Sequence, residues 1–102
     1  MNDKLKTFEN RLNSCNVKKV ETNRFEPHFN VGDFLFVENG KDLVLNKQAF
    51  LETIDGEEHL GVVVVKTKDI VTLLSHDSHE QYHSINLKNI LRCGNVLATF
   101  YP

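Results

Sequence analysis

From residue 25 onward, short apolar runs alternate with polar turn residues. The runs are rich in β-branched and aromatic residues, and dipeptides such as Gly32-Asp33 and Asp55-Gly56 mark turns between them. Many short strands with few helical stretches predict a mainly β fold. The candidate strands are residues 34–37, 43–45, 47–53 (a strand or a helical turn), 62–65, 70–74, 82–87 and 95–101.

Two of these runs have patterns that predict how their side chains are buried. Residues 62–65 are four consecutive valines, which is typical of a strand buried on both faces. Residues 95–101 alternate instead, which is typical of a strand with two different faces. One predicted face carries Val96, Ala98 and Phe100, and the other carries Leu97, Thr99 and Tyr101.

The first 23 residues are polar and lysine-rich, unlike the rest of the chain. Their few apolar side chains recur at spacings of three and four, which places them on one helical face. Asp3 is a candidate N-cap, because its carboxylate can accept backbone N–H bonds of the first turn. The sequence therefore predicts an amphipathic helix or arm over residues 1–23, packed on a β domain of residues 24–102. The face residues are Leu5, Phe8, Leu12 and Cys15.

Length and charge narrow the class of protein. A chain of 102 residues has room for one domain. Its net charge of −2 argues against a general nucleic-acid binder, because phosphate binding needs a concentrated positive surface. No apolar run approaches the roughly 20 residues of a membrane span, and the N-terminus has no secretory apolar stretch. We therefore expect a cytoplasmic protein without a membrane partner, whose two cysteines, Cys15 and Cys93, are free thiols.

Residues 24–37 carry the most informative motif. Its defining positions are Pro27, Gly32, Asp33 and Val37, together with the apolar Phe29 after the proline. This segment resembles the box of the LexA-like serine–lysine peptidases, which include the C-terminal domains of LexA and of lambda-type phage repressors, and UmuD. Residues 61–74 look like the paired strands of that family, and residues 90–100 look like its closing strand. The resemblance covers residues 24–101 and implies the LexA-like fold of short, mostly antiparallel strands, preceded here by a short helix.

The two positions that would carry the family's catalysis hold other residue types. The nucleophilic serine aligns with Arg24 and the general-base lysine with Leu74. A guanidinium has no lone pair to offer as a nucleophile, and a leucine cannot take a proton. Lys66 or Lys68 would supply a base in another register, yet position 24 would still lack a nucleophile. The resemblance therefore implies a pseudo-peptidase that is not an enzyme and uses no cofactor.

Members of this family dimerise partly by pairing their C-terminal strands. The matching positions here are Val96, Ala98, Phe100 and Tyr101. The resemblance thus implies an interaction and dimerisation module of a bacterial or phage transcription-regulatory, SOS-type system. We expect a homodimer, or pairing with a repressor or UmuD-like protein. The segment of residues 38–61 is longer than in typical members, and the sequence gives it no role.

Two other functions stay open at this stage. One is a diverged hydrolase that uses Ser75, Cys93 or a histidine, and the other is a small nucleic-acid-binding β-barrel. Ser75, His76 and Asp77 are the residue types of a hydrolytic triad, but adjacent residues in a turn point apart. His76, His79 and His83 have helical spacing within a polar turn, so we expect solvated histidines and no metal site.

Overall fold

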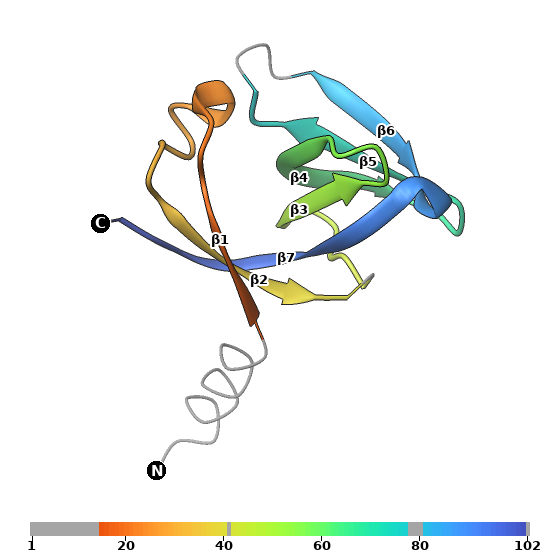
Figure 1. Ribbon diagram of the computed structural model, residues 1–102. Coiled ribbons are helices and arrows are strands. Elements are labelled where there is room, and N and C mark those ends of the chain that lie inside the picture. Colours follow the sequence, from red (N-terminus) through yellow and green to blue (C-terminus); the bar gives the residue numbers. More distant parts are fainter. Residues whose placement is uncertain (1–14, 41, 78–80, 102) are drawn as a thin grey trace.

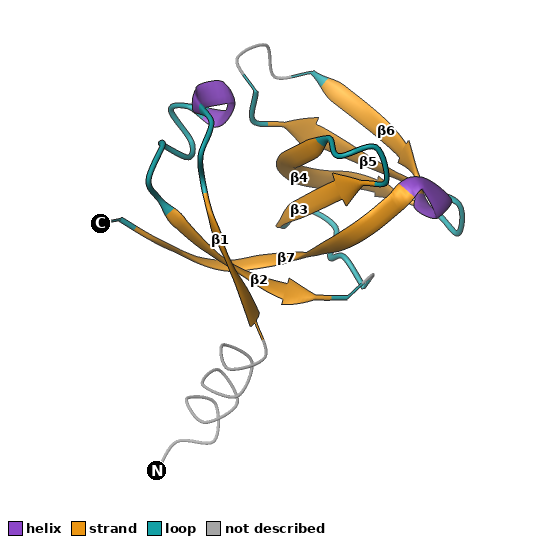
Figure 2. Cartoon of the chain, viewed as in Figure 1, coloured by secondary structure: helices purple, strands orange, loops and turns teal. Residues whose placement is uncertain are grey.

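The computed structural model describes residues 15–40, 42–77 and 81–101, and within these ranges the protein is mainly β (Figure 1). Seven strands form one antiparallel sheet in the order β1-β2-β7-β3-β4-β5-β6. Helical structure in the described ranges is confined to two 3₁₀ turns, η1 and η2 (Figure 2). The elements are β1 (Cys15–Lys19), η1 (Asn23–Phe25), β2 (Phe34–Asn39), β3 (Gln48–Thr53), β4 (Glu58–Lys66), β5 (Ile70–Ser75), β6 (Tyr82–Asn86), η2 (Leu87–Asn89) and β7 (Ile90–Phe100). The predicted mainly β class is confirmed.

Strand β7 joins the two halves of the sheet (Figure 1). Its first half pairs with β3, where Phe50 lies opposite Gly94, and β2 pairs along the strand from Gly94 to Phe100. The pairing on both edges leaves no room for a side chain at Gly94, because a Cβ there would lie 2.0 Å from the Glu38 carbonyl oxygen. A glycine is therefore required where β7 has neighbours on both edges.

The sheet buries apolar side chains on both of its faces, because successive residues of a strand point to opposite sides. Phe50 of β3 points into one cluster, and its neighbours Ala49 and Leu51 point into the other. The loop between β1 and β2 covers the first cluster, which consists of Val20, Phe25, Phe29, Leu35, Val37, Phe50 and Leu60. The second cluster consists of Leu43, Ala49, Leu51, Val63, Val71, Leu73, Ile85, Ile90 and Cys93.

The segment after β2 differs from the prediction. Residues 43–45 were predicted as a strand, but residues 42–47 form an irregular connection. Leu43 is buried, whereas Val44 and Leu45 are both half-exposed. Asn46 adopts a φ of 66°, a left-handed conformation that turns the chain into β3. The strand prediction for residues 43–45 is therefore wrong, because only one apolar side chain of the run finds a place in the core.

The valine run of β4 is also less buried than its composition indicates. Val63 has 0% exposure, but Val65 is 47% exposed. The pairing between β4 and β5 shifts register between these two residues, so the end of β4 leaves the core. The prediction of burial on both faces is wrong for this part of the strand.

At the N-terminal side, residues 15–19 form the edge strand β1, which pairs with β2. Their polar side chains, Asn16, Lys18 and Lys19, favour the predicted N-terminal arm over a strand. Cys15 begins this strand, so its expected place on a helical face is wrong. The remainder of the predicted helix, with Leu5, Phe8 and Leu12, lies outside the described residues.

A β-bulge changes the faces of β7. Val37 of β2 lies opposite Val96, and Phe36 lies opposite Ala98, so Leu97 is the extra residue. Directly opposed residues share a face, so Val96 lies with the buried Val37 while Ala98 lies with the partly exposed Phe36. The predicted single face of Val96, Ala98 and Phe100 is therefore wrong for Val96.

Candidate functional site

The motif of residues 24–37 builds a tight loop on the first core cluster. The Thr22 hydroxyl caps η1 by accepting from the Arg24 N–H at 3.2 Å. Phe25 is then buried at 2% exposure, and the Phe29 N–H donates to its carbonyl at 2.9 Å. Gly32 turns the chain with a φ of 97°, which an L side chain rarely adopts, and leads into β2. The motif thus fixes the loop that carries position 24.

Asp33 of this motif is a buried carboxylate, 3% exposed. Its Oδ2 accepts from the Asn30 N–H at 2.9 Å and closes the turn before β2. Among the other motif positions, Val37 is buried and Pro27 is exposed after a cis peptide bond with Glu26. Asp33 and Val37 are therefore structural residues: the first closes a turn and the second packs in the core.

We expect Asp33→Ala to lower the free energy of unfolding by about 1–3 kcal/mol, because it leaves a turn N–H without its acceptor. Asp33→Asn keeps an acceptor oxygen and should lose less than the alanine variant. Urea denaturation of both variants at pH 7 measures the difference. An alanine variant as stable as the wild type would contradict a structural role for this carboxylate.

The two residues that the resemblance aligns with a nucleophile and a base, Arg24 and Leu74, lie in η1 and β5. The Arg24 guanidinium donates to the Glu58 carbonyl on β4 at 3.2 Å and lies over the Phe25 ring at 5.1 Å. Leu74 lies on β5, opposite Val62 and Tyr82. Arg24 therefore ties the motif loop to β4, a bond that the sequence alone did not indicate.

The two lysines considered as substitute bases lie near the turn between β4 and β5. Lys66, at the end of β4, donates its amine to the Leu43 carbonyl at 3.0 Å, and Lys68 is exposed in the turn itself. The Lys66 amine therefore caps the irregular connection before β3.

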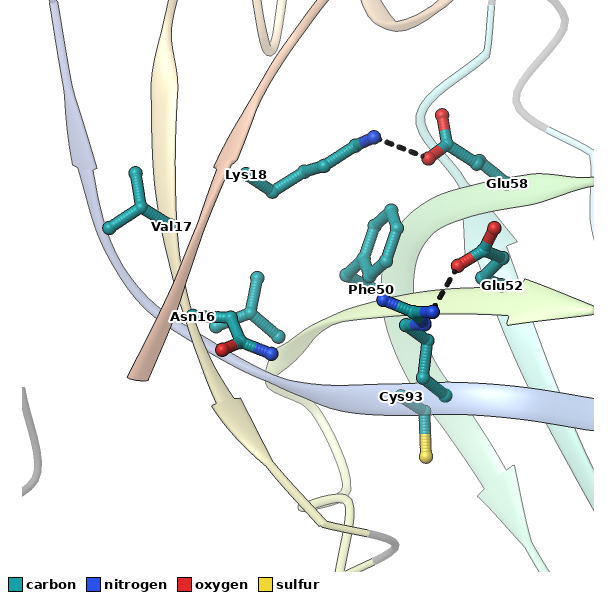
Figure 3. A pocket seen from close by; sticks show the side chains of 9 residues that line it. Asn16, Val17, Lys18, Phe50, Glu52, Glu58 and Cys93 are labelled. Carbon is teal, nitrogen blue, oxygen red and sulfur yellow. Dashed lines mark ion pairs between the residues drawn. The ribbon is translucent and has the colours of Figure 1, made fainter. Parts of the chain in front are cut away.

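A groove of about 280 Å³ lies between β1 and the β3–β4–β7 part of the sheet (Figure 3). Phe50 lies in it, with the Lys18 amine 5.9 Å from its ring centre. Ion pairs join Lys18 to Glu58 at 2.7 Å and Arg92 to Glu52 at 3.1 Å. The positive and negative side chains of the groove are thus matched to each other.

Cys93, one of the candidate nucleophiles, points away from this groove (Figure 3). Its thiol is buried in the second core cluster and donates to the Gly40 carbonyl at 3.4 Å. The geometry is that of a structural cysteine.

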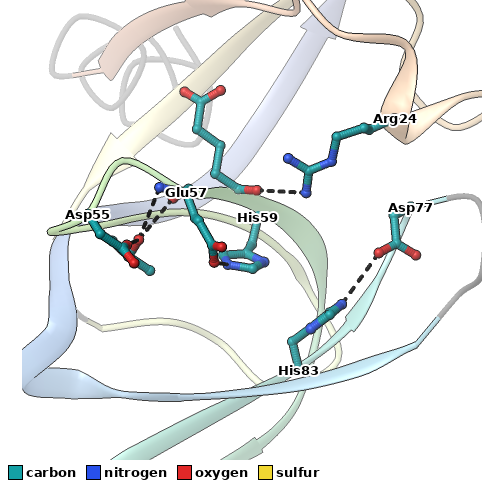
Figure 4. Close-up of polar contacts among 8 residues, drawn as sticks. Arg24, Asp55, Glu57, His59, Asp77 and His83 are labelled. Atoms are coloured by element: carbon teal, nitrogen blue, oxygen red, sulfur yellow. Dashed lines mark hydrogen bonds and ion pairs between the residues drawn. The ribbon is translucent and has the colours of Figure 1, made fainter.

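Ser75, His76 and Asp77 point in different directions. Ser75 is 1% exposed, and its hydroxyl accepts from the Asp77 N–H at 3.2 Å. The Asp77 carboxylate lies 3.4 Å from the ring of His83 (Figure 4). The His76 ring stacks on His28, with ring centres 4.2 Å apart. These three side chains therefore do not assemble as a triad.

The expectation of solvated histidines is wrong for His76. It is only 9% exposed, because its ring packs against Phe29 of the first core cluster at 5.7 Å. His83 is partly buried, and His79 lies outside the described residues. Within the described ranges, no group of three or more histidines, cysteines and carboxylates is placed to hold a metal ion.

The turn between β3 and β4 holds a perturbed carboxyl group. The Thr53 hydroxyl donates to Asp55 and accepts from the Glu57 N–H at 3.1 Å. The bond from Thr53 lowers the pKa of Asp55 below its ordinary value of 3.8. At pH values above 3.8 the charged Asp55 carboxylate therefore stabilises the turn. This contribution is lost as the pH falls through the lowered pKa.

We expect Thr53→Val to raise the pKa of Asp55, because the valine removes the donor that favours the charged carboxylate. Thr53→Ser keeps the hydroxyl and should leave the pKa low. An NMR titration of the Asp55 carboxyl carbon compares the three proteins. Equal values for wild type and Thr53→Val would show that another group lowers the pKa.

Comparison of the chain with family models, with curated proteins and with solved structures gave no match. Within the described ranges, no helix is both long and apolar enough to span a bilayer.

Proposed function

We propose that the chain is a non-catalytic interaction module that pairs with a second copy of itself through the C-terminal half of β7. The observation that carries this proposal is a free strand edge. Strand β3 pairs with one edge of β7 from Ile90 to Asn95. Beyond Asn95, no described strand pairs with this edge. Unpaired backbone groups on a strand edge favour the addition of another strand.

An apolar surface adjoins this edge. Phe36 and Phe100 contact each other there, with ring centres 4.8 Å apart, and Ala98 lies on the same face. Val17 of β1 lies opposite Phe36 and extends the surface; Val17 and Phe100 are 57% and 51% exposed. We call these four residues the outer patch. Clustered exposed apolar side chains beside a free edge are typical of a protein–protein interface.

The sequence of the edge suits pairing with an identical strand. An antiparallel pair related by a two-fold axis at Thr99 puts Ala98 opposite Phe100 of the partner subunit, twice. A small side chain facing a large aromatic one leaves room for the rings of the outer patch to meet across the axis. Tyr101, 70% exposed, follows directly and lies at the margin of this interface.

The proposal is non-catalytic because Arg24 and Leu74 occupy the positions of the nucleophile and the base. The resemblance of three segments to the LexA-like family supports a role in bacterial or phage transcription regulation. In that setting, a repressor or UmuD-like protein with a similar C-terminal strand is a second partner of suitable chemistry. The same free edge of β7 would serve both partners.

Light scattering coupled to size-exclusion chromatography tests the pairing. We expect the wild-type protein at about twice the 11.7 kDa of the chain, and Phe100→Asp as a folded monomer, because an unpaired charge at the interface is costly. Tyr82→Asp is the matched control: it places the same charge at a residue 69% exposed on the edge strand β6, outside the proposed interface, and should leave the dimer intact. Circular dichroism verifies that each variant is folded.

Four outcomes would contradict the proposal. A monomeric wild type would remove the homodimer, and a dimer that dissociates only with Tyr82→Asp would place it on β6. Labelling of one residue by a fluorophosphonate or thiol-directed probe would favour the diverged hydrolase. Salt-dependent binding to DNA or RNA would favour the nucleic-acid-binding barrel.

A further inference from the structure

Two histidines lie against each other across strands that are not neighbours in the sheet. His59 belongs to β4 and His83 to the edge strand β6, with β5 between them. Their ring centres are 5.4 Å apart (Figure 4). His59 is 8% exposed, and His83 is partly exposed. The ring contact therefore helps to hold an edge strand against a strand with which it shares no backbone ladder.

Charged groups from each neighbouring element face this pair. Glu57 of the β3–β4 turn lies 3.5 Å from the His59 ring, and Asp77 before β6 lies 3.4 Å from the His83 ring. Arg24 of η1 and Asp55 also interact electrostatically with His59. Glu57 has a side chain 68% exposed, so its attraction for an imidazolium is screened by water.

The balance of these effects opposes a charged His59. Burial lowers its pKa below the ordinary 6.5, His83 and Arg24 lower it further, and Glu57 only partly opposes them. A histidine whose pKa is lowered by folding takes up its proton more readily when the contact opens. Opening therefore becomes more favourable as the pH falls below about 6.5, by up to about tenfold per pH unit for one proton.

A cavity gives solvent access to the pair. It measures about 470 Å³ and lies between the β3–β4 turn and β6, with both His59 and His83 in its lining. Among the described strands, β6 lies at an edge of the sheet and pairs with β5 alone. Edge elements with few ladder bonds open at a lower free-energy cost than central strands.

We propose that His59 and His83 form a proton-sensitive clasp, which holds β6 over β4 at neutral pH and releases it in mild acid. Release widens the cavity and uncovers Ile85, which packs in the second core cluster. Strands β2, β3 and β7 keep their pairing. The clasp lies on β4 and β6, away from the outer patch, so it does not depend on the proposed dimer.

Hydrogen exchange with mass spectrometry at pH 7.5 and 5.5, corrected for the intrinsic exchange rate, tests the clasp. We expect protection of β6 amides to fall by up to about tenfold in the acidic sample, while β3 amides stay protected. His59→Gln removes the buried titrating group and should flatten the pH dependence, whatever its effect at pH 7.5. His28→Gln removes an exposed histidine of the other stacked pair and should leave the β6 response unchanged.

The outcomes separate the clasp from general acid unfolding. Equal loss of protection in β3 and β6 would overturn the proposal, as would an unchanged pH response in His59→Gln. An NMR titration of the wild type gives an independent reading, because His59 should titrate below 6.5. A midpoint above that value would reverse the sign and overturn the clasp.

Discussion

Gly94→Ala should destabilise the protein by about 3 kcal/mol, at the upper end of what overpacking a core costs. The added methyl group would lie 2.0 Å from the Glu38 carbonyl oxygen and 2.8 Å from a Val37 methyl group. The first obstacle is backbone held in the β2–β7 ladder, so a side-chain rotation cannot relieve it. A loss of this size is a large part of the 5–15 kcal/mol that stabilise a typical domain. Thermal and urea denaturation measure it.

The matched control for Gly94 is a glycine in open space. Gly56 has a φ of 91° in the β3–β4 turn, and a Cβ there would meet no atom within 4 Å. Gly56→Asn should cost less than about 1 kcal/mol, because asparagine tolerates the left-handed conformation. Similar losses for Gly94→Ala and Gly56→Asn would mean that β2 and β7 can separate without breaking the sheet.

Leu51→Ala is the second variant with a large expected effect, a loss of about 2–5 kcal/mol. Leu51 has 0% exposure and lies on β3, between His59 of β4 and Cys93 of β7. Its removal leaves a cavity lined by strands that are fixed by their ladders on both sides, so the site cannot collapse to fill it.

Leu91→Ala makes the same chemical change at a residue that is 54% exposed on β7. It should cost less than about 1 kcal/mol. Guanidinium denaturation of both variants compares the two sites under one condition. If Leu91→Ala cost as much as Leu51→Ala, the second core cluster would not be the main apolar contribution to stability.

The sequence predicted correctly those strands whose apolar residues are also the ones that the fold buries. Residues 34–37 and 70–74 are compact apolar runs between turn signals, and the structure has β2 and β5 there. Strand β1 was missed because its pairing with β2 is made by backbone groups, and polar side chains give no signal of it. Residues 43–45 were wrongly predicted as a strand, since an apolar triplet does not reveal whether a neighbouring strand exists.

The candidate sites depend on contacts that local sequence does not encode. The bulge at Leu97 arises from the register between β2 and β7, and simple alternation cannot show it. The contact between His59 and His83 joins residues far apart in the chain, each in an ordinary strand pattern. By contrast, the turn made by Gly32 and Asp33 was visible in the sequence, because these residue types suit the conformation and the bond required there.

The position of β7 also constrains how the protein is made. Its residues leave the ribosome after those of the other six strands, yet β7 lies between β2 and β3. During synthesis, β1 and β2 can form a hairpin and β3 to β6 can form a meander, but the two parts have no common strand until residues 90–100 emerge. The nascent chain therefore exposes the unpaired edges of β2 and β3 until β7 emerges, and this interval is when chaperone binding would matter most.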